Sequence, residues 1–187
     1  MARGTANGVL IAVGALALAA GACRAPQPER PKVAEIEKIA DTLYVIKGGG
    51  GNTAAFITDT GVVLVDTKRG GGWGQAIIDK LRTVTDKPVV MIINTHAHTD
   101  HMLGNESFPT AVDIIAQEHT RTYMETMPEF QGEKARFLPN KTFKDRMSLL
   151  SGKDRIDLYY FGPAHTNGDA IVEIGRASCR ERVSYSV

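Results

Sequence analysis

The chain has 187 residues, and its 22 lysine and arginine residues nearly balance its 21 aspartate and glutamate residues, for a formal net charge of +1. This balance excludes a polycationic nucleic-acid-binding protein. A hydrophobic content of 43% with 23% charged residues is typical of one soluble domain, here preceded by a targeting segment.

Residues 1–22 have the pattern of a signal peptide. Arg3 precedes the apolar run 9–20, which is too short to span a bilayer, where about 20 apolar residues are needed, but has the length of a signal-peptide core. The small residues that follow fit ordinary cleavage and also resemble a relaxed bacterial lipobox that ends at Cys23. Cys23 is then either a free thiol or a lipidated first residue, and lipidation would be the only membrane contact. We expect an exported protein, periplasmic or membrane-anchored, with residues 23–34 as an extended proline-containing tether.

Short strands and one helix are predicted in the first half of the chain. Residues 42–46 and 53–57 are strand candidates, and the glycine-rich segment 47–52 joins them. No helix follows this segment to form a phosphate cradle, so a mobile hairpin loop is the preferred interpretation. Residues 62–65 are a further buried strand, and residues 76–84 have apolar positions at the spacing of a helix packed on a sheet.

The strongest chemical signal follows the apolar run 89–95, which has the composition of an inner strand. His96, His98, Asp100 and His101 come directly after it, where open α/β sheets usually place ligands. Imidazole nitrogen and carboxylate oxygen are ligands that zinc, iron(II) and manganese accept, and His96 and His98 point to the same side of an extended chain. A solvated polar loop is the alternative, and the density of metal-type donors favours a metal site.

The next part of the chain adds structure but no donor cluster. Residues 112–116 are a predicted strand, and residues 117–127 a predicted helix. His119 lies in that helix without a donor partner, so we expect a surface residue and not a metal ligand. Residues 128–144 show no clean period and are expected to be an irregular excursion at one side of a pocket.

A second polar loop follows a second predicted strand near the end of the chain. Residues 156–161 read as that strand, and the loop after it carries His165 and Asp169 before a last strand begins at residues 170–173. His165 alone would be weak support for a metal site. Asp169 is expected to fix the loop by accepting backbone N–H bonds, with direct metal ligation as the alternative.

Two motifs carry a resemblance to a known family. Residues 95–101, T-H-A-H-T-D-H, resemble the H-x-H-x-D-H signature of the metallo-β-lactamase superfamily, and residues 162–169, G-P-A-H-T-N-G-D, resemble its G-x-x-H-T-x-G-D motif. The resemblance covers about residues 36–172. It implies an α/β fold, the αβ/βα metallo-β-lactamase-like sandwich, of which this chain supplies the first half and an incomplete second half. It also implies that Asp66 supports the loop that carries the first motif.

The same resemblance implies roles for individual residues. His96, His98 and His165 match the ligands of the first metal site, and Asp100 with His101 matches part of the second. Asp100 is also implied to be catalytic, because it orients the attacking hydroxide. The family's later bridging aspartate and final histidine have no evident counterpart in this chain.

The expected function is that of an exported zinc-dependent hydrolase that uses a metal-bound hydroxide. The resemblance implies one or two Zn²⁺ ions, with Fe or Mn as alternatives, and a small-molecule substrate such as a β-lactam, an ester or a thioester. A nucleic-acid partner is not expected, because the chain has no basic surplus. The alternative is a non-catalytic metal-binding lipoprotein or an inactive fragment, which the unmatched ligands favour.

The last residues differ in character from the rest. Residues 174–187 include a segment that resembles one reading frame of a common sequencing-library adapter. We therefore expect the natural domain to comprise residues 35–173 and the remainder to be a sequencing artefact.

Overall fold

The structure is a computed structural model of the chain, and it describes Met1, residues 34–175 and the backbone of residues 182–185. Apart from Met1 and Ala34, the predicted signal peptide and tether, with Cys23, lie outside the described residues. None of the helices in the described ranges combines the length and the apolar character that crossing a bilayer requires.

A seven-stranded mixed sheet forms the larger layer. Its first four strands are antiparallel neighbours, and the last four run parallel to one another. The strands lie in chain order: β1 (Glu35–Lys38), β2 (Leu43–Lys47), β3 (Thr53–Ile57), β4 (Val62–Val65), β5 (Val89–Ile93), β6 (Asp113–Gln117) and β7 (Lys141–Phe143).

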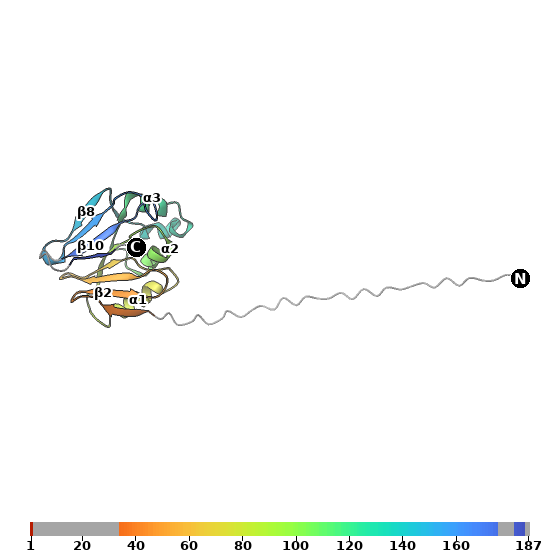
Figure 1. Cartoon of the computed structure of the whole chain (residues 1–187). Helices are drawn as coiled ribbons and strands as arrows, with labels where there is room; N and C mark the ends of the chain where they lie inside the picture. The colour runs from red at the N-terminus through yellow and green to blue at the C-terminus, as the bar shows by residue number, and fades with distance from the viewer. Residues whose placement is uncertain (2–33, 176–181, 186–187) are drawn as a thin grey trace. The chain divides into compact units, whose positions relative to one another are not determined.

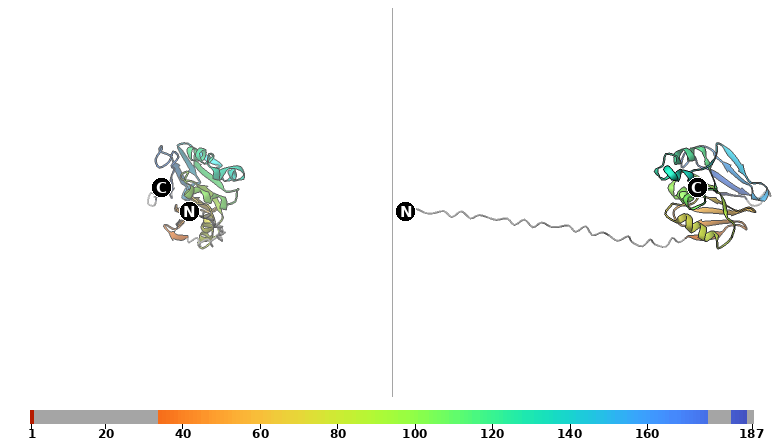
Figure 2. Two further views of the ribbon diagram at one scale, coloured as in Figure 1. Left: turned by 90° about the vertical axis from the view of Figure 1, so that its right-hand side faces the viewer. Right: turned by 180° about the vertical axis from the view of Figure 1, so that it is seen from behind.

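A four-stranded antiparallel sheet forms the second layer, in the order β11-β10-β9-β8. Figures 1 and 2 show β8 and β10 stacked above the larger sheet, with α1 beyond it. The strands are β8 (Arg146–Leu149), β9 (Ile156–Tyr159), β10 (Ile171–Gly175) and β11 (Arg182–Tyr185).

The helices are short. The α-helices are α1 (Trp73–Leu81), α2 (Thr99–Met102) and α3 (Glu118–Met124), and the 3-10 helices are η1 (Leu103–Ser107), η2 (Pro128–Phe130), η3 (Gly132–Phe137) and η4 (Gly152–Asp154).

The side chains of β4 point alternately into two hydrophobic cores. Val63 and Val65 pack with Leu158 and Val172 in the core between the two sheets. Their neighbours Val62 and Leu64 point the other way and pack with residues of α1. Because both faces of the strand are buried, it is a continuous apolar run, as expected for a strand with parallel neighbours.

This arrangement places the polar motifs at one edge. The strands β4, β5 and β6 are parallel neighbours, so their carboxyl ends, at Val65, Ile93 and Gln117, meet at the same edge of the larger sheet. Helix α2, which carries Asp100 and His101, lies at this edge.

Several predicted boundaries were wrong by a few residues, and one segment was misjudged. The predicted strand 89–95 ends at Ile93. Residues 128–144 were predicted to be irregular but contain two 3-10 helices and the strand β7. Strand β10 continues to Gly175, with Ile174 buried in the core, and β11 pairs with it. Strand pairing does not test the origin of residues 174–187, so the artefact stays a prediction.

Candidate metal centre

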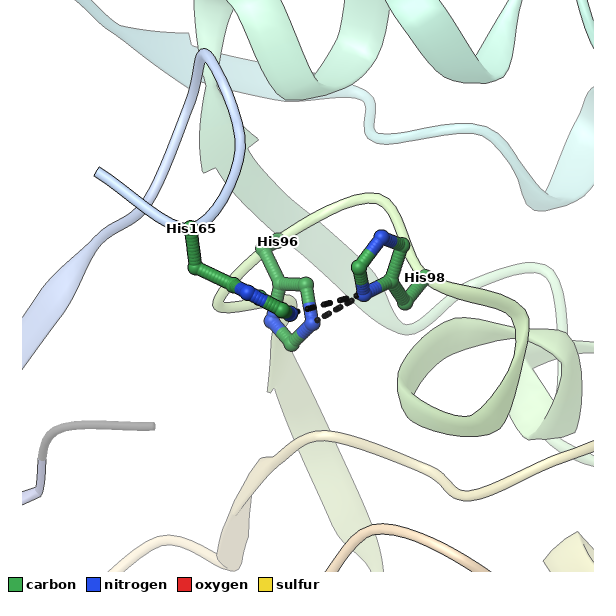
Figure 3. Close-up of side chains that lie close together, drawn as sticks. All are labelled: His96, His98 and His165. Carbon is green, nitrogen blue, oxygen red and sulfur yellow. Dashed lines mark hydrogen bonds between the residues drawn. The ribbon is translucent and has the colours of Figure 1, made fainter. Parts of the chain in front are cut away.

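Three histidines converge at the edge where the strands end. His96 and His98 come from the loop after β5, and His165 comes from the loop between β9 and β10 (Figure 3). His98 Nδ1 lies 3.2 Å from His96 Nε2 and 3.0 Å from His165 Nε2. The three nitrogen atoms lie within 4.8 Å of one another, so one ion could contact all of them.

The spacing and the chemistry of these atoms fit a metal ion. Two nitrogen ligands at 2.0–2.1 Å from a tetrahedral zinc ion lie roughly 3.3 Å apart, close to the observed separations. Hydrogen bonding explains the cluster less well, because His98 Nδ1 faces two ring nitrogens but carries only one proton or one lone pair, so it cannot form a full hydrogen bond with both. A cation at the centre would instead receive a lone pair from each ring.

A chain of hydrogen bonds orients His96. Thr95 Oγ1 donates to Asp66 Oδ2 at 2.7 Å. Thr95 Oγ1 also lies 2.9 Å from His96 Nδ1. Because the hydroxyl proton points to the carboxylate, the Thr95 oxygen accepts from His96 Nδ1–H, which leaves the lone pair of Nε2 facing the cluster. Such outer contacts hold the ring and its tautomer in the form that binds metal.

Asp66 orients His101 as well. The carboxylate lies 2.7 Å from His101 Nδ1 and accepts a 2.8 Å bond from the Thr95 backbone N–H. The inferred supporting role of Asp66 is therefore confirmed. Burial alone would lower the pKa of His101, but the hydrogen bond and charge of Asp66, with the charge of Asp100, outweigh it and raise the pKa.

Asp100 lies at the margin of the cluster. Its Oδ2 is 3.8 Å from His101 Nε2, and its side chain is 39% exposed. The two donor groups found among the described residues are His96 with His98 and His165, and Asp66 with His96 and His101. The structure thus places Asp100 and His101 beside the first site, and their ligation of a second ion stays a prediction.

The loop that carries His165 is held by its own bonds. Asp169 Oδ2 accepts a 2.6 Å bond from the Thr166 N–H, as expected for a residue that fixes the loop. Ala170 N–H donates to Thr95 O at 2.8 Å, which ties this loop to the first motif. The other oxygen, Asp169 Oδ1, is buried without a hydrogen-bond partner among the described residues, and the charge of this carboxylate acts on His96, where it favours a positive charge.

An amide pair lies behind the motif. Asn105 and Asn94 exchange hydrogen bonds of 2.9 and 3.3 Å, and Thr67 Oγ1 donates to Asn105 Oδ1 at 2.8 Å. These fully buried polar groups satisfy one another, so they fix the end of β5 against the segment after α2.

A cavity of about 340 Å³ opens beside the cluster. His98 and His165 line one part of it, and His119, Thr120 and Tyr123 of α3 line another. His119 is exposed and belongs to neither donor group, in agreement with its prediction as a surface residue.

We expect the free energy of unfolding of the metal-free chain to fall as the pH drops from 6.5 toward 4. Burial, reinforced by the nearby charge of His101, lowers the pKa of His96 from 6.5 to about 4. In this range the unfolded chain binds a proton that folded His96 does not bind, so stability is lost with acid, by up to about 3 kcal/mol. Urea titrations with a chelator present would measure this.

A His96→Gln variant is the control for this dependence of the free energy of unfolding on pH, because glutamine does not titrate. His101, with its raised pKa, acts in the opposite sense and in another range: its contribution is present below pH 6.5 and is lost as the pH rises through that raised value. An acid slope of equal size in the variant would contradict the assignment to His96.

Comparison with known proteins places these motifs in one family. Residues 46–179 match the sequence profile described as the Metallo-beta-lactamase superfamily. A protein of Elizabethkingia meningoseptica named metallo-beta-lactamase type 2 is 30% identical over 162 residues, which are 77% of this chain and 58% of that protein. The 2,4-dinitroanisole O-demethylase subunit alpha of Nocardioides sp. strain JS1661 is 29% identical over 136 residues, 71% of this chain and 40% of that protein.

A solved structure supports the fold. The metallo-beta-lactamase from Pontibacter korlensis superposes with a TM-score of 0.65 at 21% identity, over 76% of this chain and 67% of that one. The predicted α/β sandwich with an incomplete second half is thereby confirmed. The chain spans less than two thirds of the length of each of the two curated relatives described above.

Proposed function

The chain belongs to the metallo-β-lactamase superfamily, and from this membership and its histidine cluster we propose that it is a zinc-dependent hydrolase of small molecules. The observation that carries the proposal is the convergence of His96, His98 and His165 from two separate loops on one point. Three imidazole ligands with a fourth position open is the arrangement of a catalytic zinc ion, whereas structural zinc sites use four protein ligands.

The residues of the site would have different roles in the reaction. When bound, the ion would lower the pKa of a water molecule to about 7 and polarise the scissile carbonyl group. His96, His98 and His165 would hold that ion, and Asp66 would keep the His96 ring in the tautomer that binds it. Asp100, the partly exposed carboxylate at the margin, would orient the attacking water by accepting its hydrogen bond.

The substrate is proposed by class only. The cavity next to His98 and His165 has a size suited to a small molecule, and we propose a β-lactam, an ester or a thioester. The two curated relatives described above are named for different substrates, a β-lactam and an aryl methyl ether, so their names do not decide among these classes. Export through residues 1–22, with Cys23 as a lipid anchor, is part of the same proposal and suits a substrate outside the cytoplasm.

A substrate panel on zinc-loaded protein tests the proposal. We expect hydrolysis of at least one of a chromogenic β-lactam, an aryl ester and a thioester, and no hydrolysis of a phosphodiester. The activity should disappear with a chelator, return with zinc, and be absent in His96→Ala. Stoichiometric zinc without turnover of any member would instead support the non-catalytic metal-binding alternative, and the absence of bound metal would contradict both.

A further inference from the structure

Lys68 is buried in a way that is unusual for a lysine. Its residue is 0% exposed, although lysines are almost never fully buried unless their charge is satisfied. It lies just after β4, and its φ of 67° is in the left-handed region, which costs roughly 1–2 kcal/mol for a residue with a side chain. Strain of this kind persists only where surrounding contacts enforce it.

The ammonium group of Lys68 has two carbonyl partners. Nζ donates to Ile46 O at 2.7 Å and to Gly51 O at 2.9 Å. Ile46 lies in β2, and Gly51 lies near the far end of the glycine loop, residues 47–52, that leads into β3. One buried cation therefore bonds both arms of this loop, with bonds that are stronger than those between neutral groups.

The same loop rests on the second half of the metal motif. A Cβ atom at Gly51 would lie 2.6 Å from His101 Cε1, and one at Gly50 would lie 2.8 Å from Asp100 Cβ. The loop backbone is thus in close contact with both residues. The sequence predicted a mobile hairpin here, whereas the structure shows a loop seated on the motif and bonded from behind by Lys68.

From these contacts we infer that Lys68 is a positioning residue, whose ammonium group holds the glycine loop against Asp100 and His101 and so sets the shape of that side of the metal centre. The inference goes beyond the proposed hydrolase function and does not depend on it, because it concerns contacts that exist without metal or substrate.

The test is amide hydrogen exchange in Lys68→Met, which keeps the side-chain length and removes the charge. We expect exchange of the amides of residues 48–52 to accelerate at least tenfold, with the amides of β5 unchanged. Lys87→Met is the matched control, because Lys87 Nζ also donates to two carbonyls, those of Thr58 and Asp59, at a different turn. It should leave residues 48–52 unaffected.

A chemical rescue separates the ammonium group from simple filling of space. In a background with Cys23→Ser and Cys179→Ser, the variant Lys68→Cys is alkylated in denaturant with 2-bromoethylamine and refolded, which restores a side chain of lysine length with its charge. Protection of residues 48–52 should return with this group and not with a neutral propyl group. Equal rescue by the neutral group, or unchanged exchange in Lys68→Met, would overturn the inference.

The unaltered protein provides a measurement that does not depend on any variant folding. In ¹⁵N-labelled chain, the Lys68 ammonium protons should exchange slowly enough to give a signal at neutral pH, and that signal should show contacts to the Gly51 backbone. A Lys68 ammonium that exchanges as fast as those of exposed lysines would refute the inference even if every Lys68 variant failed to fold.

Discussion

Replacing His96 by alanine is expected to lower the affinity of the chain for zinc by more than about 100-fold. The reason is that His96 is the buried member of the three-histidine cluster, 1% exposed, and its ring is held in place by Thr95 and Asp66. Loss of an outer contact alone typically costs 10–100-fold in metal affinity, so loss of the ligand should cost more. Competition with a chromogenic chelator at constant pH would measure the change.

His119→Ala is the control for this experiment. His119 lines the same cavity as His98 and His165 but belongs to neither donor group, so its removal should leave zinc affinity within about twofold. Circular dichroism should show that both variants keep the fold. Equal zinc affinity in His96→Ala and the unmodified chain would show that the cluster does not bind the ion.

The inner strands of the larger sheet could be predicted from the sequence, whereas its two edge strands could not. Residues 53–57 and 62–65 were predicted as strands and form β3 and β4, because buried strands are continuous apolar runs. The edge strands β1 and β7 have three or four residues each, most of them polar. Their pairing is decided by the neighbouring strand, which local composition does not reveal.

The three histidines of the cluster were predictable because of their place in the sequence. His96 and His98 are near neighbours in sequence, so their spacing already brings them together, and His165 was recognised through its motif. Lys68 and Thr95 had no such signal, because their roles depend on partners from distant segments. Contacts that only the tertiary structure creates are the part of the site that sequence patterns could not supply.

The backbone around Gly104 leaves no room for a side chain. Gly104 N–H donates to Lys68 O at 3.0 Å, and Thr67 N–H donates to His101 O at 2.7 Å, so two backbone segments touch directly. A Cβ atom at Gly104 would lie 1.9 Å from Thr67 O. The atom in the way belongs to the backbone, so no side-chain rotation can relieve the clash.

We therefore expect Gly104→Ala to destabilise the metal-free chain by about 3 kcal/mol or more, at the upper end of what overpacking costs. The turn at Thr67 must move to make room, and with it the adjacent Asp66, which orients His96 and His101. The substitution should also weaken zinc binding, although it removes no ligand. Urea unfolding and chelator competition on the same preparation would measure both effects.

Gly71→Ala distinguishes this clash from the general effect of replacing a glycine. Gly71 has a φ of 69°, and a Cβ atom there would meet no heavy atom of the described residues within 4 Å, so only the cost of the left-handed backbone applies, about 1–2 kcal/mol. Zinc affinity should be unchanged in this variant, because the added methyl group would meet nothing through which the ligands could shift. If Gly104→Ala were no more destabilising than Gly71→Ala, the direct contact between the two backbone segments could not be what holds the motif in place.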